Sequence, residues 1–595
     1  MNYSFSSSHK NKKNNNTSED KKEIQETWSR WFWKRHDKLW KKCLKVVNIM
    51  EISSGSKVEN LLNRPVTAPT DKYHNNLRKW QYRNQRNVTE QQSRSWEQLF
   101  SGMGVGVLTL GAGLRNFSPD HLHSEGNWKC PQEVSQDEIM NKVGDKLVQL
   151  PFPLHSPQGL EWLFSVRLGA WFLQKDFKNT FGASTFSSPS YDQIVTAHFT
   201  TLSTYETKVG TIKIDAQIWF SLDETNHCLK WEKMRYQNNI ITSYADPKFE
   251  DASRAIMCCV VTDVSILHHA LNSHLLIGDI FASATHTCLT DLKHPVRRFL
   301  QPFCYGVWDI SNLVRSVLIA KDGTLNTVFS FSYEGLKNYI QDTFDNYDMS
   351  TVHVLPNFLR EKGLLTREKG QNNSSSYRIS SALPMWEDAY EYWKMFVVYV
   401  EELTVAAGYK CDQDVFEDPF LQHWAKEIFR QQPHLHSCPL QFPMGLADFR
   451  LLCTIFMYHS VISHEIASNA NDLVTTPYAV TTMWREPQET KGCPLEQVPL
   501  EEKISTRDVS RRALIAAHTT ALQVKRFDIA WGYVAYPEDE GLFYKCSKAY
   551  EVRKVMNSIP LRLKQVDDLI QERNQVRKYP NESLRSYELN CSIAV

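Results

Sequence analysis

Five histidines lie in one apolar stretch of the chain, and they limit how that stretch can fold. His268, His269, His274, His286 and His294 all fall within residues 260–295, where most of the other residues are apolar. A stretch this apolar is buried in a folded protein, and a buried imidazole needs a hydrogen-bond partner or a metal ion. The fold must therefore place polar partners inside its core.

Two helices can close around one metal ion through these side chains. His269 and His274 are five residues apart, which places them about 140° apart on an ideal α-helix. A π-type turn would bring both onto one face, and such turns gather at functional sites. His459 and Ser463 are four apart in a second apolar stretch and share a helix face. For any one of these histidines, the alternative is a core residue that is hydrogen-bonded to a neighbour.

The rest of the chain from about residue 148 onward predicts a mainly α fold. Apolar residues recur at spacings of three and four in residues 386–409 and 418–432, which is typical of amphipathic helices. The clearest alternating pattern is GTIKIDAQIWFSL at 210–222, which predicts a strand. We therefore expect one large helical domain with a small β component.

The N-terminal part reads differently, and we expect the domain boundary near residue 95. Residues 1–26 are rich in Ser, Asn and Lys and predict a flexible tail. Residues 27–50 mix tryptophans with lysines and arginines, which suits either a helix at a membrane surface or one packed on the main body. A polar linker follows, so we expect residues 1–95 to form an extension and 96–595 to form the main domain. The first 150 residues contain no β-sandwich pattern.

Charge and cysteine usage narrow the class of protein further. The 68 Lys and Arg nearly balance the 67 Asp and Glu, which gives no reason to expect nucleic acid as a partner. The 13 cysteines contain no CxxC pair and favour a reducing compartment. Because neither a signal peptide nor a run of eighteen apolar residues is evident, we expect a cytoplasmic protein, with residues 27–50 as a candidate peripheral membrane contact.

Over roughly its last 450 residues the chain resembles a lipoxygenase. The matching segments occur in the family's order and are HALNSH (269–274), HPVRRFLQPF (294–303), DISNLVRSVLI (309–319), DVFEDPFLQHWAKEI (414–428), FPMGLADFRLLCTIFMYH (442–459) and LNCSIAV (589–595). The last segment is similar to the family's terminal Asn-Ser-Val-Ala-Ile pattern, in which the final residue binds the metal. The resemblance implies a lipoxygenase-type helical catalytic domain.

The resemblance also implies a set of metal ligands. His269, His274 and His459 would be the imidazole ligands, the α-carboxylate of Val595 a further ligand, and Ser463 would occupy a weak fourth protein position. His464 is an alternative to this set, one residue out of register. In another register, His269 and His274 take the places of an earlier non-ligand histidine and the first ligand, and Asp279 stands where the second histidine would be.

By the same resemblance, the expected reaction is the dioxygenation of polyunsaturated fatty acids such as linoleate or arachidonate to hydroperoxides. One non-haem iron per chain would begin it by hydrogen abstraction from a bis-allylic carbon, and manganese is an alternative metal. No catalytic group is expected beyond the metal-bound hydroxide. A hydroperoxide isomerase with the same site, producing epoxyalcohols, is a second hypothesis. A metal-free lipoxygenase-like lipid-binding protein is a third.

Two neighbouring residues are candidates for the substrate and oxygen pocket. Val314 stands where lipoxygenases usually carry alanine or glycine, at a position linked to where oxygen enters. The larger valine would narrow that space, although a change in core packing would explain it equally well. Arg315 can bind a fatty-acid carboxylate or form a structural ion pair.

Overall fold

A computed structural model of the chain describes residues 156–177, 193–208, 215–291, 293–304, 307, 310–311, 314–319, 325, 329–369, 375–432, 442–468, 548–586 and 589–593. The predictions for residues 1–95, the boundary near residue 95 and the carboxylate of Val595 lie outside the described residues.

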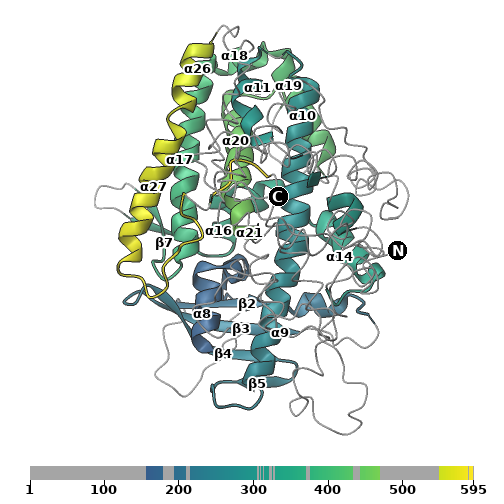
Figure 1. Ribbon diagram of the computed structural model, residues 1–595, viewed down its shortest axis with the longest axis vertical. Helices are drawn as coiled ribbons and strands as arrows, with labels where there is room; N and C mark the ends of the chain where they lie inside the picture. The colour runs from purple at the N-terminus through teal and green to yellow at the C-terminus, as the bar shows by residue number, and fades with distance from the viewer. Residues whose placement is uncertain are drawn as a thin grey trace, which may run out of the picture.

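A small antiparallel sheet lies at one end of the molecule (Figure 1). Its strands follow chain order and are β1 (Gln174–Lys175), β2 (Ile194–His198), β3 (Ala216–Asp223), β4 (Cys228–Tyr236) and β5 (Asn239–Ile241). The strand expected at 210–222 is confirmed as β3, within the described part of that segment. In the β3–β4 hairpin, Asp223 accepts hydrogen bonds from the backbone N–H groups of Thr225 and Asn226, which stabilises the turn. Helix α8 (Pro157–Val166), capped by Ser156, packs against β4.

The histidine-rich stretch forms one long helix through the core. It begins as α9 (Phe249–Asp263), continues as the π-helix η6 (Val264–Asp279) and ends as α10 (Ile280–Cys288). Both junction residues, Val264 and Ile280, keep right-handed helical dihedrals, so the axis is not interrupted. Figure 1 shows this helix running from the sheet towards the opposite end of the molecule. The expectation of a π-type turn in this stretch is confirmed.

Two other predicted helices are confirmed with closely similar bounds. The first, α17 (Pro384–Ala407), begins with a proline in its first turn and ends at Gly408, whose φ of +106° is readily adopted only by glycine. The second, α19 (Pro419–Gln431), begins after Asp418, whose carboxylate accepts hydrogen bonds from the N–H groups of Phe420 and Leu421.

The second ligand-bearing stretch also forms a continuous helix, made of α20 (Leu446–Tyr458), η9 (His459–Ser463) and α21 (His464–Ser468). The middle part, η9, is again a π-helix. Segment α21 packs against η6, and α20 packs against α17. The two apolar stretches singled out from the sequence therefore lie side by side.

The remaining described elements surround this core. They are η3 (Leu168–Phe172), η5 (Thr200–Thr204), α11 (Pro295–Leu300), η7 (Gln301–Cys304), η8 (Val314–Leu318), α14 (Tyr333–Asp345), α15 (Met349–Val352), α16 (Leu355–Glu361), β6 (Leu365–Lys369), β7 (Ser375–Ile379), α18 (Asp412–Phe416), α26 (Ala549–Met556) and α27 (Ile559–Asn574). Helices α26 and α27 pack along α17, as Figure 1 shows. The fold is mainly α, as predicted.

Two helical runs within the described residues, Phe249–Cys288 and Leu446–Ser468, are long and apolar enough to cross a membrane by length and composition. Most of each run is buried inside the protein, 72% and 78% of the most apolar windows. Helices whose apolar side chains are largely buried against the rest of the protein are typical of a protein core, and both runs fit this description.

Candidate metal centre

The π-helix η6 brings two of the predicted ligands onto one face. Residues five apart lie close to the same face of a π-helix, because each of its turns contains more residues than an α-turn. Accordingly, Nε2 of His274 lies 3.1 Å from Nε2 of His269, and the two ring centroids are 4.7 Å apart. The predicted pairing of these imidazoles therefore depends on the local widening of this helix.

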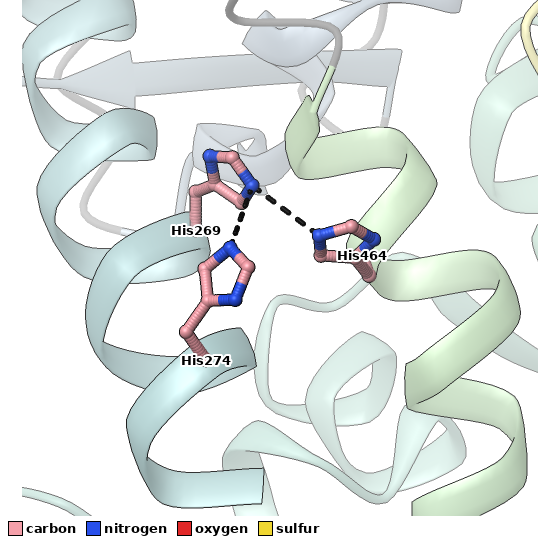
Figure 2. A group of neighbouring side chains, drawn as sticks. All are labelled: His269, His274 and His464. Atoms are coloured by element: carbon pink, nitrogen blue, oxygen red, sulfur yellow. Dashed lines mark hydrogen bonds between the residues drawn. The ribbon is translucent and has the colours of Figure 1, made fainter. Parts of the chain in front are cut away.

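The third imidazole comes from α21. Nε2 of His464 lies 3.3 Å from Nε2 of His269, and its ring centroid is 5.1 Å from that of His274. Figure 2 shows the three rings projecting from two facing helices towards a common point. The three Nε2 positions belong to a group whose ligand atoms all lie within 4.8 Å of one another. Among the described residues, the structure thus gathers His269, His274 and His464.

These distances are compatible with a shared metal ion as well as with hydrogen bonds, and the donor chemistry favours the ion. Nitrogens bound to one metal at about 2.1 Å, with angles of roughly 90–109°, lie about 3.0–3.4 Å apart. The two Nε2–Nε2 distances, 3.1 and 3.3 Å, fall in that range. A single imidazole nitrogen is either a donor or an acceptor, whereas a cation would satisfy all three lone pairs together. The donor set therefore suits a metal that accepts imidazole ligands.

Burial keeps the imidazole of His274 uncharged. His274 is 1% exposed, and desolvation lowers its pKa well below the usual 6.5, assisted by the neighbouring His269 and His464. A lowered pKa means that the ring is neutral at neutral pH, with a lone pair available. Metal ligation requires this neutral form.

Ser468 is a site residue that the sequence reasoning missed. It lies four residues after His464, and its Oγ is 3.4 Å from Nε2 of His464 and 3.5 Å from Nε2 of His269. Its hydroxyl faces the space that the imidazoles enclose. The sequence contained a pattern that could have identified Ser468, because the spacing of four between His459 and Ser463 recurs between His464 and Ser468.

His459 and Ser463 lie apart from this group. Nε2 of His459 lies 3.1 Å from Oγ of Ser273, and its ring meets that of His353 edge-on at 4.7 Å. Ser463 is buried at the end of η9, immediately before His464. The structure therefore places His464 and Ser468, rather than His459 and Ser463, beside His269 and His274. The two pairs are five residues apart, close to one turn of a π-helix.

The alternative register that used Asp279 as a ligand does not match the geometry. Asp279 is fully buried, forms an ion pair with Arg315 and accepts a hydrogen bond from Ser283 at 3.2 Å. Its carboxylate is thus engaged with η8 instead of the imidazoles. Of the two roles considered for Arg315, the structural ion pair is the one observed. Val314 is also fully buried on η8, which packs against η6.

Comparison with known proteins identifies relatives of this chain. The sequence profile of the Lipoxygenase family matches residues 255–438. The polyunsaturated fatty acid lipoxygenase ALOX15 of Sus scrofa is 29% identical over 249 residues, which cover 40% of this chain and 35% of that protein. The hydroperoxide isomerase ALOXE3 of Mus musculus is 29% identical over 229 residues, which cover 38% and 30% respectively. The aligned part spans about a third of either relative.

The fold is shared with solved structures. The crystal structure of coral 8R-lipoxygenase superimposes with a TM-score of 0.62 over 94% of this chain and 81% of that chain, at 15% sequence identity. At this level of identity the likeness concerns the fold alone. The structural match extends well beyond the segment covered by the sequence profile.

Proposed function

We propose that this chain, which the lipoxygenase family profile matches over residues 255–438, adds dioxygen to polyunsaturated fatty acids at a mononuclear non-haem metal. The observation that carries this proposal is the convergence of three Nε2 atoms, from His269, His274 and His464, between η6 and α21. Three imidazoles with further oxygen donors suit iron, and manganese accepts the same donor types. Iron is the metal proposed.

In this proposal Ser468 takes the weak fourth protein position. A hydroxyl is a poor donor to iron, so this position serves to hold a solvent molecule or to stay loosely bound. The α-carboxylate of Val595 as a further ligand stays a prediction. When bound, the iron supplies the one-electron chemistry that removes a hydrogen atom from a bis-allylic carbon.

The protein's own part is to hold these imidazoles among buried apolar side chains. Leu271 and Leu275 on η6, and Val461 and Ile462 on η9, are fully buried beside the ligand-bearing turns. An apolar lining excludes water and favours a hydrocarbon chain over a polar substrate. This environment supports a fatty acid as the substrate class.

The proposal is tested by elemental analysis of the purified full chain, with oxygen uptake and conjugated-diene absorbance measured on linoleate and arachidonate. We expect near-stoichiometric iron and turnover. Deletion of Val595 moves the terminal carboxylate back by one residue and should abolish both the bound iron and the turnover. V595A changes the side chain but keeps the carboxylate at position 595, so it should retain both. A full chain that purifies without metal, resists metal loading and still binds fatty acid would instead identify a lipid-binding protein.

Hydroperoxide isomerisation is a second candidate, favoured by the similarity to the isomerase ALOXE3 of Mus musculus. The same histidines would serve both reactions, so the ligand set does not separate them. The protein should be given a preformed fatty-acid hydroperoxide under nitrogen and, separately, the free fatty acid in air. Formation of epoxyalcohols from the hydroperoxide, together with no oxygen uptake on the free fatty acid, would identify the protein as an isomerase rather than a dioxygenase.

A further inference from the structure

Residues 589–593 bridge the two helices that carry the histidines. All five side chains are buried, with exposed fractions between 0% and 6%. Asn590 contacts α21 through Glu465, and Ile593 approaches η6 at Gly278. This short segment is called the brace below.

The contact with α21 is a buried hydrogen bond directly beside a candidate ligand. Nδ2 of Asn590 donates to Oε2 of Glu465 at 2.9 Å, and Glu465 is 1% exposed. Glu465 follows His464 in sequence. Burying a carboxylate is unfavourable unless hydrogen bonds compensate, so the position of α21 is coupled to the position of Asn590.

The contact with η6 is made at a glycine. A Cβ built on Gly278 would lie 2.9 Å from the carbonyl oxygen of Ser273, which is too close, and 3.3 Å from Cδ1 of Ile593, which would have to move slightly. Gly278 lies four residues after His274 on the same π-helix. The missing side chain therefore lets the brace pack closely on the helix that carries the other two imidazoles.

The brace starts from a firmly held part of the chain. Arg577 and Asn581 both donate hydrogen bonds to the fully buried carboxylate of Asp388 on α17, at 2.7–2.9 Å. Tyr392, also on α17, donates to the carbonyl oxygen of Leu584 at 2.8 Å. Segment 577–584, which precedes the brace, is thus fixed to α17.

We propose that the brace sets the spacing between His464 and the pair His269 and His274, with Asn590 and Glu465 as positioning residues. This inference rests on the proposed function, since it assumes that the three imidazoles bind a metal. Groups that orient ligands without touching the metal typically change metal affinity 10–100-fold when they are altered. Breaking the bond between Asn590 and Glu465 should therefore weaken metal binding without removing any ligand.

The test uses a reciprocal exchange in the full chain. N590D places two buried carboxylates against each other, whereas the double variant E465Q/N590D reverses donor and acceptor and restores one hydrogen bond. N226D is a matched control, because Nδ2 of Asn226 donates to Asp223 at 2.7 Å in an exposed turn of the β3–β4 hairpin. Ferrous ion affinity is measured anaerobically by competition with a chelator. Melting temperatures are measured with and without ferrous ion.

We expect N590D to lower ferrous ion affinity at least about tenfold and to reduce the rise in melting temperature that the ion produces. E465Q/N590D should recover most of both, and N226D should match the unmodified chain. If N590D lowers the melting temperature equally with and without the ion, and leaves the affinity unchanged, the bond is only structural and the inference is wrong. Failure of the unmodified chain to bind ferrous ion would overturn the proposed function itself, which separates the two outcomes.

Discussion

Nε2 of His464 lies 3.3 Å from Nε2 of His269, although 195 residues separate the two in sequence. Each imidazole stands on or directly beside a π-helical turn, η6 and η9, inside a long buried helix. Extra residues in a turn shift all later side chains around the helix axis, so both turns take part in directing the rings towards each other.

The ligand assignment predicts opposite outcomes for two histidines on the same helix. H464A removes an imidazole from the cluster, so purified protein should lose most of its bound iron and its oxygen uptake. H459A removes a ring that contacts Ser273 and His353 and should keep near-stoichiometric iron. Elemental analysis of both variants checks this. Iron retained in H464A but lost in H459A would instead support His459, the ligand that the sequence resemblance implies.

The buried ion pair between Asp279 and Arg315 predicts a large effect on stability. R315M leaves a fully buried carboxylate uncompensated and should cost about 3–5 kcal/mol in the free energy of unfolding. The double variant D279L/R315M should cost less, because it removes both charges. R430M, which breaks the exposed pair with Glu427, should cost at most about 1 kcal/mol. Denaturant unfolding measures all three. Equal costs for R315M and R430M would contradict the structural role of Arg315.

Acid should destabilise the metal-free protein through His353. Burial lowers the pKa of His353 to about 3, from the usual 6.5. Its contribution to stability is therefore fully present above pH 6.5 and is lost as the pH falls from 6.5 towards 3, because the unfolded chain binds the proton more readily. In that range the loss approaches about 1.4 kcal/mol per pH unit for one group.

The variant H353F keeps a ring against His459 and Tyr347 and removes the titrating group. Urea unfolding of chelator-treated protein at a series of pH values from 7.5 to 4.5 should show a shallower pH dependence for H353F than for the unmodified chain. Identical slopes would show that His353 does not titrate in this range.

Val314 predicts an effect on the product. The sequence resemblance places this buried valine where lipoxygenases usually carry alanine or glycine, so V314A should open space beside η6 and change the carbon that is oxygenated or the handedness of the product. Chiral chromatography of the reduced products measures the ratio. V260A, buried on α9, deletes the same atoms nine residues before His269 and should leave the ratio unchanged. An unaltered ratio in V314A would assign Val314 to core packing alone.

The sequence by itself predicted several of the elements and the pairing of two histidines on one helix. Periodic apolar residues predicted α17 and α19, because amphipathic patterns depend only on near neighbours along the chain. The spacing of His269 and His274 predicted a π-type turn for a similar reason, since both residues belong to one helix. The histidine-rich apolar stretches indicated a buried cluster of imidazoles that could bind a metal.

Only the tertiary structure decided which residues of the second helix meet the first. His459 with Ser463 and His464 with Ser468 have the same spacing on the same buried helix, so local patterns favour neither pair. The choice depends on how α20, η9 and α21 are positioned along and around η6, and packing between segments nearly 200 residues apart sets that position. The same holds for the ion pair of Asp279 with Arg315 and the bond of Asn590 with Glu465. Such contacts are determined by the packing of the whole core, which no short stretch of sequence encodes.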